Sequence, residues 1–158
     1  MHELSPLEFL RLRFEFIARE PVHFPAGQAG TLVRGALGCF LRKVGDSVQY
    51  ARVFAPRACG GPSGFRDAPR PFVLRAAHLD GCSFSADAPF AFDIHLFDRS
   101  PSVVDAIKTA FAEIANEGLG PSRGKAELVS AEVSSYSIDL LPQADDPGAI
   151  QVEFVTPT

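Results

Sequence analysis

The order of elements along the chain predicts an α+β fold of the ferredoxin-like type, in which two helices pack on one face of an antiparallel sheet. Residues 9–18 alternate between apolar and charged side chains, as expected of a half-buried strand. Two segments repeat their apolar residues at helical spacing, 31–45 and 99–118. Further strand patterns occupy 71–79, 90–98, 126–140 and 150–157. The predicted order is therefore β-α-β-β-α-β with one added strand.

The first strand is expected to bury its even-numbered positions, which are apolar from residue 10 to residue 16. Arg11 and Arg13 then lie on the opposite face, and Asp93 and His95 of the strand at 90–98 share that face. The predicted fold leaves this face uncovered by helices. A half-charged open sheet is the kind of surface on which RNA-recognition domains bind RNA, although the fold alone decides no function.

The first helix, expected over residues 31–45, turns its apolar positions, Val44 included, toward the core. Arg42 and Lys43 fall in its last turn, where the helix dipole favours cations, and Gly45 is expected to end it.

Two glycines inside this helix, Gly35 and Gly38, each weaken it by about 1 kcal/mol relative to alanine. Their presence indicates that a sheet or a ligand approaches the helix closely. The following residues, 52–70, are rich in Gly, Pro and Arg without periodicity, and are expected to form a long loop.

The second helix has clear signals at both ends. Ser100 is a plausible cap, Pro101 suits the first helical position, and Gly118 is expected to end the helix with a left-handed residue. The stretch after it, "GLGPSRGKAEL", holds more glycine than a helix stop requires. Gly120 and Gly124 are therefore candidates for close backbone packing or ligand contact.

Charge is distributed unevenly along a chain whose net charge is -4. Between Arg34 and Arg75 lie eight basic and two acidic residues, so this segment carries +6 and the rest -10. Such asymmetry suits a polyanionic partner, while scattered arginines on a solvated loop are the alternative reading.

Composition excludes several classes of protein. The three cysteines, Cys39, Cys59 and Cys82, are far apart and form no C-x-x-C pair, so neither a disulfide framework nor a metal site is expected. No apolar run is long enough for a membrane span, and the N-terminus does not resemble a signal sequence. We expect a soluble cytoplasmic protein of one domain, residues 1–158, without a cofactor.

Four pieces in order carry a family resemblance: "FPAGQAGTLVRGALGCFL", "YARVFAP" followed by "RPFVL", "GLGPSRGKAEL", and "VEFVTPT". Together they resemble the N-terminal half of the CRISPR-associated repeat RNA endoribonucleases of the RAMP superfamily. The resemblance implies two tandem ferredoxin-like domains that bind a CRISPR repeat transcript and cut it without metal. The chain would then be the N-terminal half of a longer protein, with RNA, a second RAMP domain and other CRISPR-associated proteins as partners.

The resemblance also implies site residues. A histidine would assist attack of the 2′-hydroxyl on the scissile phosphate, leaving a 2′,3′-cyclic phosphate, while cations stabilise the developing charge. The expected first helix contains no histidine, so His23 and His95 are the catalytic candidates. His78 is expected to be structural within a strand. The expected RNA contacts are Arg11, Arg13, Arg34, Arg42, Lys43, Gly120, Arg123, Gly124 and Lys125.

Two other functions stay open at this stage. A non-catalytic structural subunit of a CRISPR ribonucleoprotein is favoured by the missing helix histidine and the negative net charge. A small-molecule-binding regulatory module is the generic alternative for this fold. An unpaired strand edge would favour a homodimer, and the strand ending near Thr158 is the expected edge.

Overall fold

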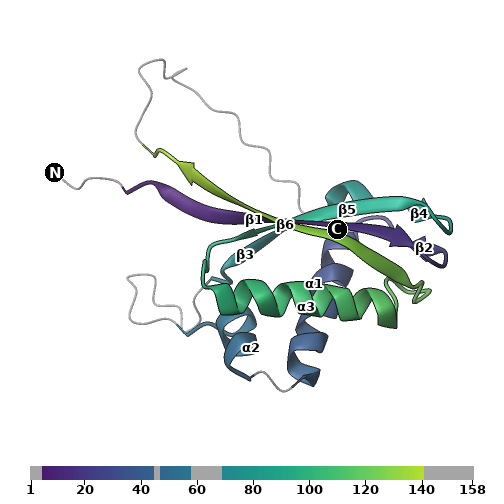
Figure 1. Cartoon of the computed structure of the whole chain (residues 1–158), viewed down its shortest axis with the longest axis horizontal. Helices are drawn as coiled ribbons and strands as arrows, with labels where there is room; N and C mark the ends of the chain where they lie inside the picture. Colours follow the sequence, from purple (N-terminus) through teal and green to yellow (C-terminus); the bar gives the residue numbers. More distant parts are fainter. Residues whose placement is uncertain (1–4, 45–46, 58–68, 141–158) are drawn as a thin grey trace, which may run out of the picture.

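The structure is a computed structural model that describes residues 5–44, 47–57 and 69–140. Its elements follow one another as β1 (Leu7–Ala18), β2 (Val22–His23), α1 (Ala29–Lys43), α2 (Ser47–Phe54), β3 (Phe72–Arg75), the 3-10 turn η1 (Ala77–Leu79), β4 (Ser83–Phe84), β5 (Pro89–Leu96), α3 (Pro101–Glu117) and β6 (Ala126–Ile138). The helices lie on one side of the sheet and leave its other side open (Figure 1).

The sheet has the strand order β3-β5-β1-β6, with all neighbours antiparallel. If only its four strands are counted along the chain, this order is 2-3-1-4, the ferredoxin-like arrangement with two crossover connections through α1 and α3. The predicted fold class is therefore confirmed. The expected added strand at 150–157 lies outside the described residues.

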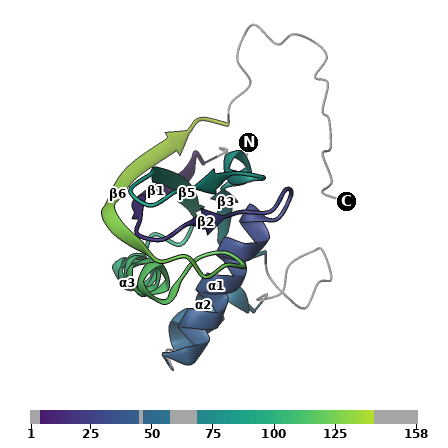
Figure 2. The same cartoon turned by 90° about the vertical axis from the view of Figure 1, so that its right-hand side faces the viewer.

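The core fills the space between the sheet and the helices. β1 buries Leu12, Phe14 and Phe16, as its alternation predicted, and the Phe14 ring meets that of Phe111 from α3 at a centroid distance of 4.8 Å. The apolar stripe of α3 is buried as expected. Figure 2 shows the strongly twisted sheet from its end, with β6 curving along one border above the helices.

Two details at the start of α3 differ from expectation. Ser100 occupies the N-cap position but makes no capping bond with its side chain. Its hydroxyl and its backbone N–H both donate to Asp98 Oδ1, at 2.7 and 3.1 Å. Asp98 also accepts two hydrogen bonds from Arg52 of α2 at 3.0 Å, so this carboxylate joins α2 to the start of α3.

The predictions for α1 were partly wrong. Val44 is 57% exposed, because α1 ends at Lys43 and Val44 is its C-cap residue, outside the buried stripe of the helix. A Cβ at Gly38 would lie 3.1 Å from the Phe54 ring, so a close approach exists there. At Gly35 nothing lies within 4 Å of that position.

Some elements escaped prediction because they are short. The expected loop at 52–70 begins inside α2, which runs from Ser47 to Phe54, and residues 58–68 lie outside the described part. Residues 77–79 form η1 and not a strand, which places His78 in a turn where its Nε2 lies 2.8 Å from the carbonyl oxygen of Ala91. The two-residue strands β2 and β4 form a separate small sheet.

Candidate nucleic-acid interface

The open face of the sheet is built by the register of its four strands. Arg11 of β1 lies opposite His95 of β5, and Arg13 lies opposite Asp93. On the outer strand β3, Arg75 lies opposite Asp93 in turn. Directly opposite residues project to the same side of an antiparallel sheet, so these side chains form neighbouring rows on the face without helices.

An aromatic cluster occupies the same face at the beginning of β1. The Phe9 ring stacks on Tyr136 of β6, with centroids 5.5 Å apart and an interplanar angle of 12°. On its other side it contacts His95 at 4.9 Å and Phe97 at 5.8 Å. Phe9 is only 8% exposed although no helix covers it, whereas Tyr136 is 42% exposed.

A hollow of about 310 Å³ joins the aromatic cluster to the charged rows, and its lining residues are Phe9, Arg11, Arg75, Asp93, His95 and Tyr136. It therefore combines ring faces, two guanidinium groups and one carboxylate. A nucleotide presents a flat ring and an anionic phosphate, and these groups match such a lining. We call this site the sheet-face hollow.

Ion pairs hold part of the hollow in place. Arg11 donates two hydrogen bonds to Asp93 Oδ2, at 3.0 and 2.7 Å, and Arg13 donates one to Asp93 Oδ1 at 3.4 Å. Hydrogen bonds with Tyr136 and Asp93 raise the pKa of Arg11 above its ordinary value. Arg75 forms no ion pair with any residue of the described ranges. Arg75 is thus the cation of the hollow that is available to a ligand.

The pKa of His95 lies below its ordinary value. Burial against Phe9 and the positive charges of Arg75 and Arg11 lower its pKa, while Asp93 acts in the opposite direction. A neutral imidazole can accept a proton, and its ring can also stack on a base. The expected position of His95 on the open face is confirmed.

His23 lies far from this hollow. It belongs to β2, which follows the opposite end of β1, and its Nδ1 lies 2.8 Å from Ser83 Oγ. The structure therefore does not bring the two candidate histidines together. Either one would have to act without the other.

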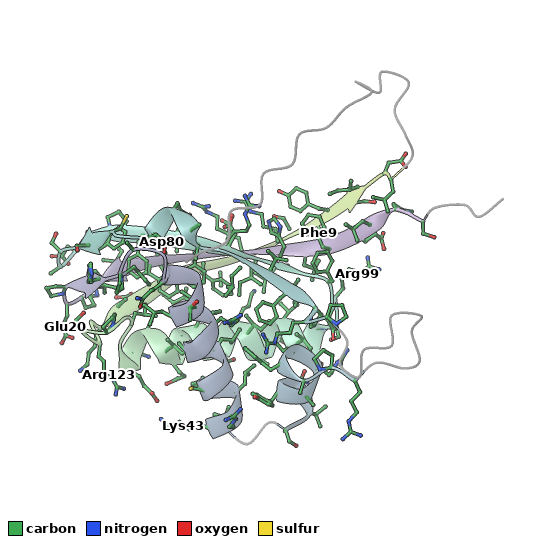
Figure 3. The ribbon with its side chains drawn as sticks, turned by 180° about the vertical axis from the view of Figure 1, so that it is seen from behind. Phe9, Glu20, Lys43, Asp80, Arg99 and Arg123 are labelled. Atoms are coloured by element: carbon green, nitrogen blue, oxygen red, sulfur yellow. The ribbon has the colours of Figure 1, made fainter. Side chains whose placement is uncertain are left out.

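The predicted cations of the helix layer fall in a different place. A groove of about 370 Å³ between α1 and the end of α3 is lined by Lys43, Gly120 and Arg123 among others. Lys43 Nζ pairs with Glu117 Oε1 at 2.7 Å. Figure 3 shows Lys43 at the end of α1 and Arg123 in the loop after α3. These residues are not on the open face with Arg11 and Arg13.

The glycines of this loop are required by the chain itself. A Cβ at Gly124 would lie 2.1 Å from the carbonyl oxygen of Pro21, and one at Gly120 would lie 2.4 Å from that of His23. Gly120 also has a positive φ of 71°. The Gly124 N–H donates to the carbonyl oxygen of Leu119 at 3.1 Å, so it is not open to a phosphate. The tight packing expected of this loop is thus present, against the segment that contains β2.

The remaining predicted RNA contacts are dispersed. Arg34 lines another groove, beside β3. Arg42 donates to the hydroxyl of Tyr50, and its guanidinium lies 5.0 Å from the centre of that ring. Lys125 lies at the beginning of β6, where its N–H donates to Glu20 Oε2 at 3.1 Å. The nine predicted positions therefore form no single continuous surface.

Sequence reasoning missed the aromatic part of the hollow. Phe9 shares the alternation of Arg11 and Arg13, so its place on the open face could have been deduced. Tyr136 could have been assigned to that face only with the β1–β6 register, in which it lies opposite Phe9.

Two findings concern other kinds of site. No group of three or more His, Cys, Asp or Glu side chains within the described ranges could hold a metal ion. In the same ranges, no helix is both long and apolar enough to span a membrane.

Solved structures share this fold. The Csm3–Csm4 subcomplex of the type III-A CRISPR-Cas interference complex contains a chain with a TM-score of 0.56 and 14% identity; the match covers 85% of this chain and 82% of that one. For a chain of the type III-B Cmr-β complex bound to cognate target RNA, the TM-score is 0.54 and the identity 14%; the match covers 80% of this chain and 61% of that one. For a Cas6 product complex the TM-score is 0.45 and the identity 17%; the match covers 78% of this chain and 40% of that one.

At identities this low, the TM-scores of 0.56 and 0.54 show a shared fold alone. A search of the curated proteins gave no match. A family model described as an N-terminal domain, AF_1859_N, matches residues 7–146, which is most of the chain. The chain therefore belongs to the AF_1859_N family of N-terminal domains.

Proposed function

We propose that this domain binds single-stranded RNA on the open face of its sheet and serves as an RNA-holding subunit of a CRISPR ribonucleoprotein. The observation that carries the proposal is the sheet-face hollow, where aromatic rings lie beside an arginine that has no carboxylate partner among the described residues. Stacking of a base on an aromatic ring contributes about 1 to 3 kcal/mol. Arg75 would neutralise the adjoining phosphate.

The negative net charge does not oppose this function. Screening limits the effect of distant charges to about 8 to 10 Å, so a ligand in the hollow experiences mainly its lining. That lining contains Arg11 and Arg75 against Asp93, and the pKa of His95 is lowered. The local balance is positive.

The shared fold supports the CRISPR part of the proposal. One of the structures with this fold is a CRISPR complex bound to target RNA, and another is a subcomplex of two CRISPR subunits. We propose RNA and other CRISPR-associated proteins as the partners of this chain. That it forms the N-terminal half of a two-domain protein stays a prediction, with which the description of the family model agrees.

Metal-independent RNA cleavage is a second candidate function, favoured by the surroundings of His95. An unprotonated imidazole could take the proton of a 2′-hydroxyl while Arg75, the cation of the hollow without an ion pair in the described residues, faces the phosphate. The O2′–P bond would form and the P–O5′ bond would break, leaving a 2′,3′-cyclic phosphate, and the proton taken up by His95 would pass to the departing O5′ to give a 5′-hydroxyl end. His23 shares no such surroundings, so we rank it below His95.

RNA binding is tested by the fluorescence anisotropy of a labelled single-stranded RNA at two salt concentrations. We expect binding that weakens steeply with salt, and a strong loss for Arg75→Glu. Lys108→Glu on α3 is the charge-matched control and should bind like the unaltered protein. Failure of the domain to bind RNA at low salt, or an equal loss for both variants, would contradict the proposal.

Cleavage is tested separately, in EDTA with CRISPR repeat RNA, by mass spectrometry of the product ends. A 2′,3′-cyclic phosphate that disappears in His95→Gln and persists in His23→Ala would establish the second function. Binding without cleavage would leave the RNA-holding role alone.

A further inference from the structure

A groove of about 830 Å³ runs between the first half of α1 and the outer edge of β3. Phe72, Leu74 and Ala76 line it from the sheet side, while Thr31 and Arg34 line it from α1. Figure 3 shows Asp80 beside the start of α1, at one end of this groove. Arg34 is among the predicted RNA contacts, but the proposed RNA function rests on the sheet-face hollow, whose lining shares no residue with this groove except through the strand β3 itself.

The backbone of β3 offers hydrogen-bonding groups to this groove. The Phe97 N–H donates to the carbonyl oxygen of Pro71 at 2.8 Å, which makes these two residues a hydrogen-bonded pair. Such pairs recur at every second position of an antiparallel ladder, so Val73 and Arg75 direct their backbone groups toward β5. The N–H and C=O groups of Phe72 and Leu74 therefore point outward. In the described part of the chain, β5 is the sole strand that pairs with β3.

The side chains that line the groove carry a net positive charge. Arg34 and Arg70 are its two cations, and its one carboxylate, Asp80, is occupied in accepting the N–H of Ala29 at 2.8 Å. The first turn of α1 has no acidic residue, and Gln28 makes no capping bond with its side chain. Asp80 accepts the first N–H of α1, and the N–H groups that follow it in the first turn add to the positive potential at this end.

Space for a further chain is available beside the strand. Apart from the adjoining backbone, no atom of the described residues lies within 4 Å of the position that a Cβ would take at Gly27 or at Gly30, the two glycines of the groove. Val73, on the open face of β3, is 48% exposed. An added strand would lie next to this side chain and cover part of it.

We propose that an extended acidic segment of a partner protein binds here as an additional strand along β3. Its backbone would pair with Phe72 and Leu74, and its carboxylates would meet Arg34 and Arg70. In this mode of recognition the main-chain bonds provide affinity and the side-chain contacts provide specificity.

The same observations disfavour the other occupants. RNA phosphates would meet outward carbonyl oxygens as well as N–H groups, because both alternate along a strand edge. Symmetric pairing of two β3 edges from two copies would bring like charges, Arg34 and Arg70, close to their equivalents. An extended acidic peptide offers backbone partners to both the N–H and the C=O groups of β3, and its carboxylates are opposite in charge to Arg34 and Arg70.

The test uses a fluorescent peptide of about nine residues that alternates valine and glutamate, with a valine–lysine peptide as its counterpart. We expect the acidic peptide to bind and to shift the backbone amide NMR signals of Phe72 and Leu74. Methylation of the peptide nitrogens that face β3 should abolish binding, because these nitrogens would lose the hydrogen atoms that they donate to the strand. The double variant Arg34→Glu with Arg70→Glu should weaken binding about tenfold or more, and Lys108→Glu should leave it unchanged.

Several results would overturn the inference. One is equal binding of the acidic and basic peptides, and another is no binding of the acidic peptide at millimolar concentration. A third is a set of shifted amides outside the groove. Displacement of the peptide by RNA, with shifts at the same amides, would assign the groove to RNA. Concentration-dependent dimerisation that Arg34→Glu changes would assign it to a second copy of the chain.

Discussion

The His95 ring lies against the Phe9 ring on the open face of the sheet, with centroids 4.9 Å apart and planes inclined at 35°. This contact removes part of the imidazole from water at a site where the charges of Arg75 and Arg11 also disfavour a positive charge on His95. The aromatic cluster and the charged rows are therefore coupled through one titratable group.

Stability should fall in acid because of His95. Its pKa is lowered in the folded state, so the unfolded chain binds the proton more readily. The contribution of His95 to the free energy of unfolding is fully present above the ordinary histidine pKa of 6.5 and is lost as the pH falls below it. Urea unfolding at about pH 7.5 and about pH 5.5 should show a smaller loss for His95→Gln than for the unaltered protein. An identical loss in both proteins would exclude this role for His95.

Tyr136 should contribute to RNA affinity without being needed for the fold. Tyr136→Ala removes an exposed ring from the hollow and should weaken binding of single-stranded RNA by about 1 kcal/mol or more. Val133→Ala is the matched control, since Val133 belongs to the same strand, is 41% exposed, and lies on the opposite face. Anisotropy titrations measure both, and equal effects would place the RNA elsewhere.

The loop glycines and a helix glycine should respond in opposite ways to alanine. Gly124→Ala places a methyl group 2.1 Å from the Pro21 carbonyl oxygen and should cost about 2 to 4 kcal/mol of unfolding free energy. Gly35→Ala meets nothing within 4 Å and should stabilise α1 by up to about 1 kcal/mol. Thermal and urea unfolding measure both. A neutral Gly124→Ala would show that the loop can move away from β2.

Asp98 should be a strong local determinant of stability. Burial tends to raise its pKa, but hydrogen bonds from Ser100 and the charge of Arg52 outweigh burial and lower it. Asp98→Ala removes the acceptor shared by α2 and the start of α3, and should cost about 1 to 3 kcal/mol. Asp105→Ala, an exposed change on α3, should cost little. Unfolding in acid should show that the Asp98 contribution is lost as the pH falls below its ordinary range near 3.8.

Long periodic segments were predictable from sequence, and short ones were not. The alternation in β1 and the apolar stripe of α3 determine their buried faces, so both were correctly assigned. β2 and β4 have two residues each, too few for any period to appear. His78 lay in a segment that begins as β3 and turns into η1, where local sequence does not mark the change.

The candidate site was predictable in its charges but not in its assembly. Alternation alone put Arg11 and His95 on the open face. Tyr136 comes from the far end of the described chain, and only strand pairing places it beside Phe9. The cations were predicted as one set, yet Lys43 and Arg34 line separate grooves, because a list of charges contains no information on which side of a helix faces which neighbour.

The central position of β1 has a consequence for synthesis of the protein. β1 leaves the ribosome first among the strands, but both of its neighbours, β5 and β6, are made much later. Until then its apolar side chains and both of its edges lack native partners. The nascent chain therefore exposes an aggregation-prone strand until β5 and β6 have been made, and a chaperone that shields extended apolar segments should raise the yield of folded protein.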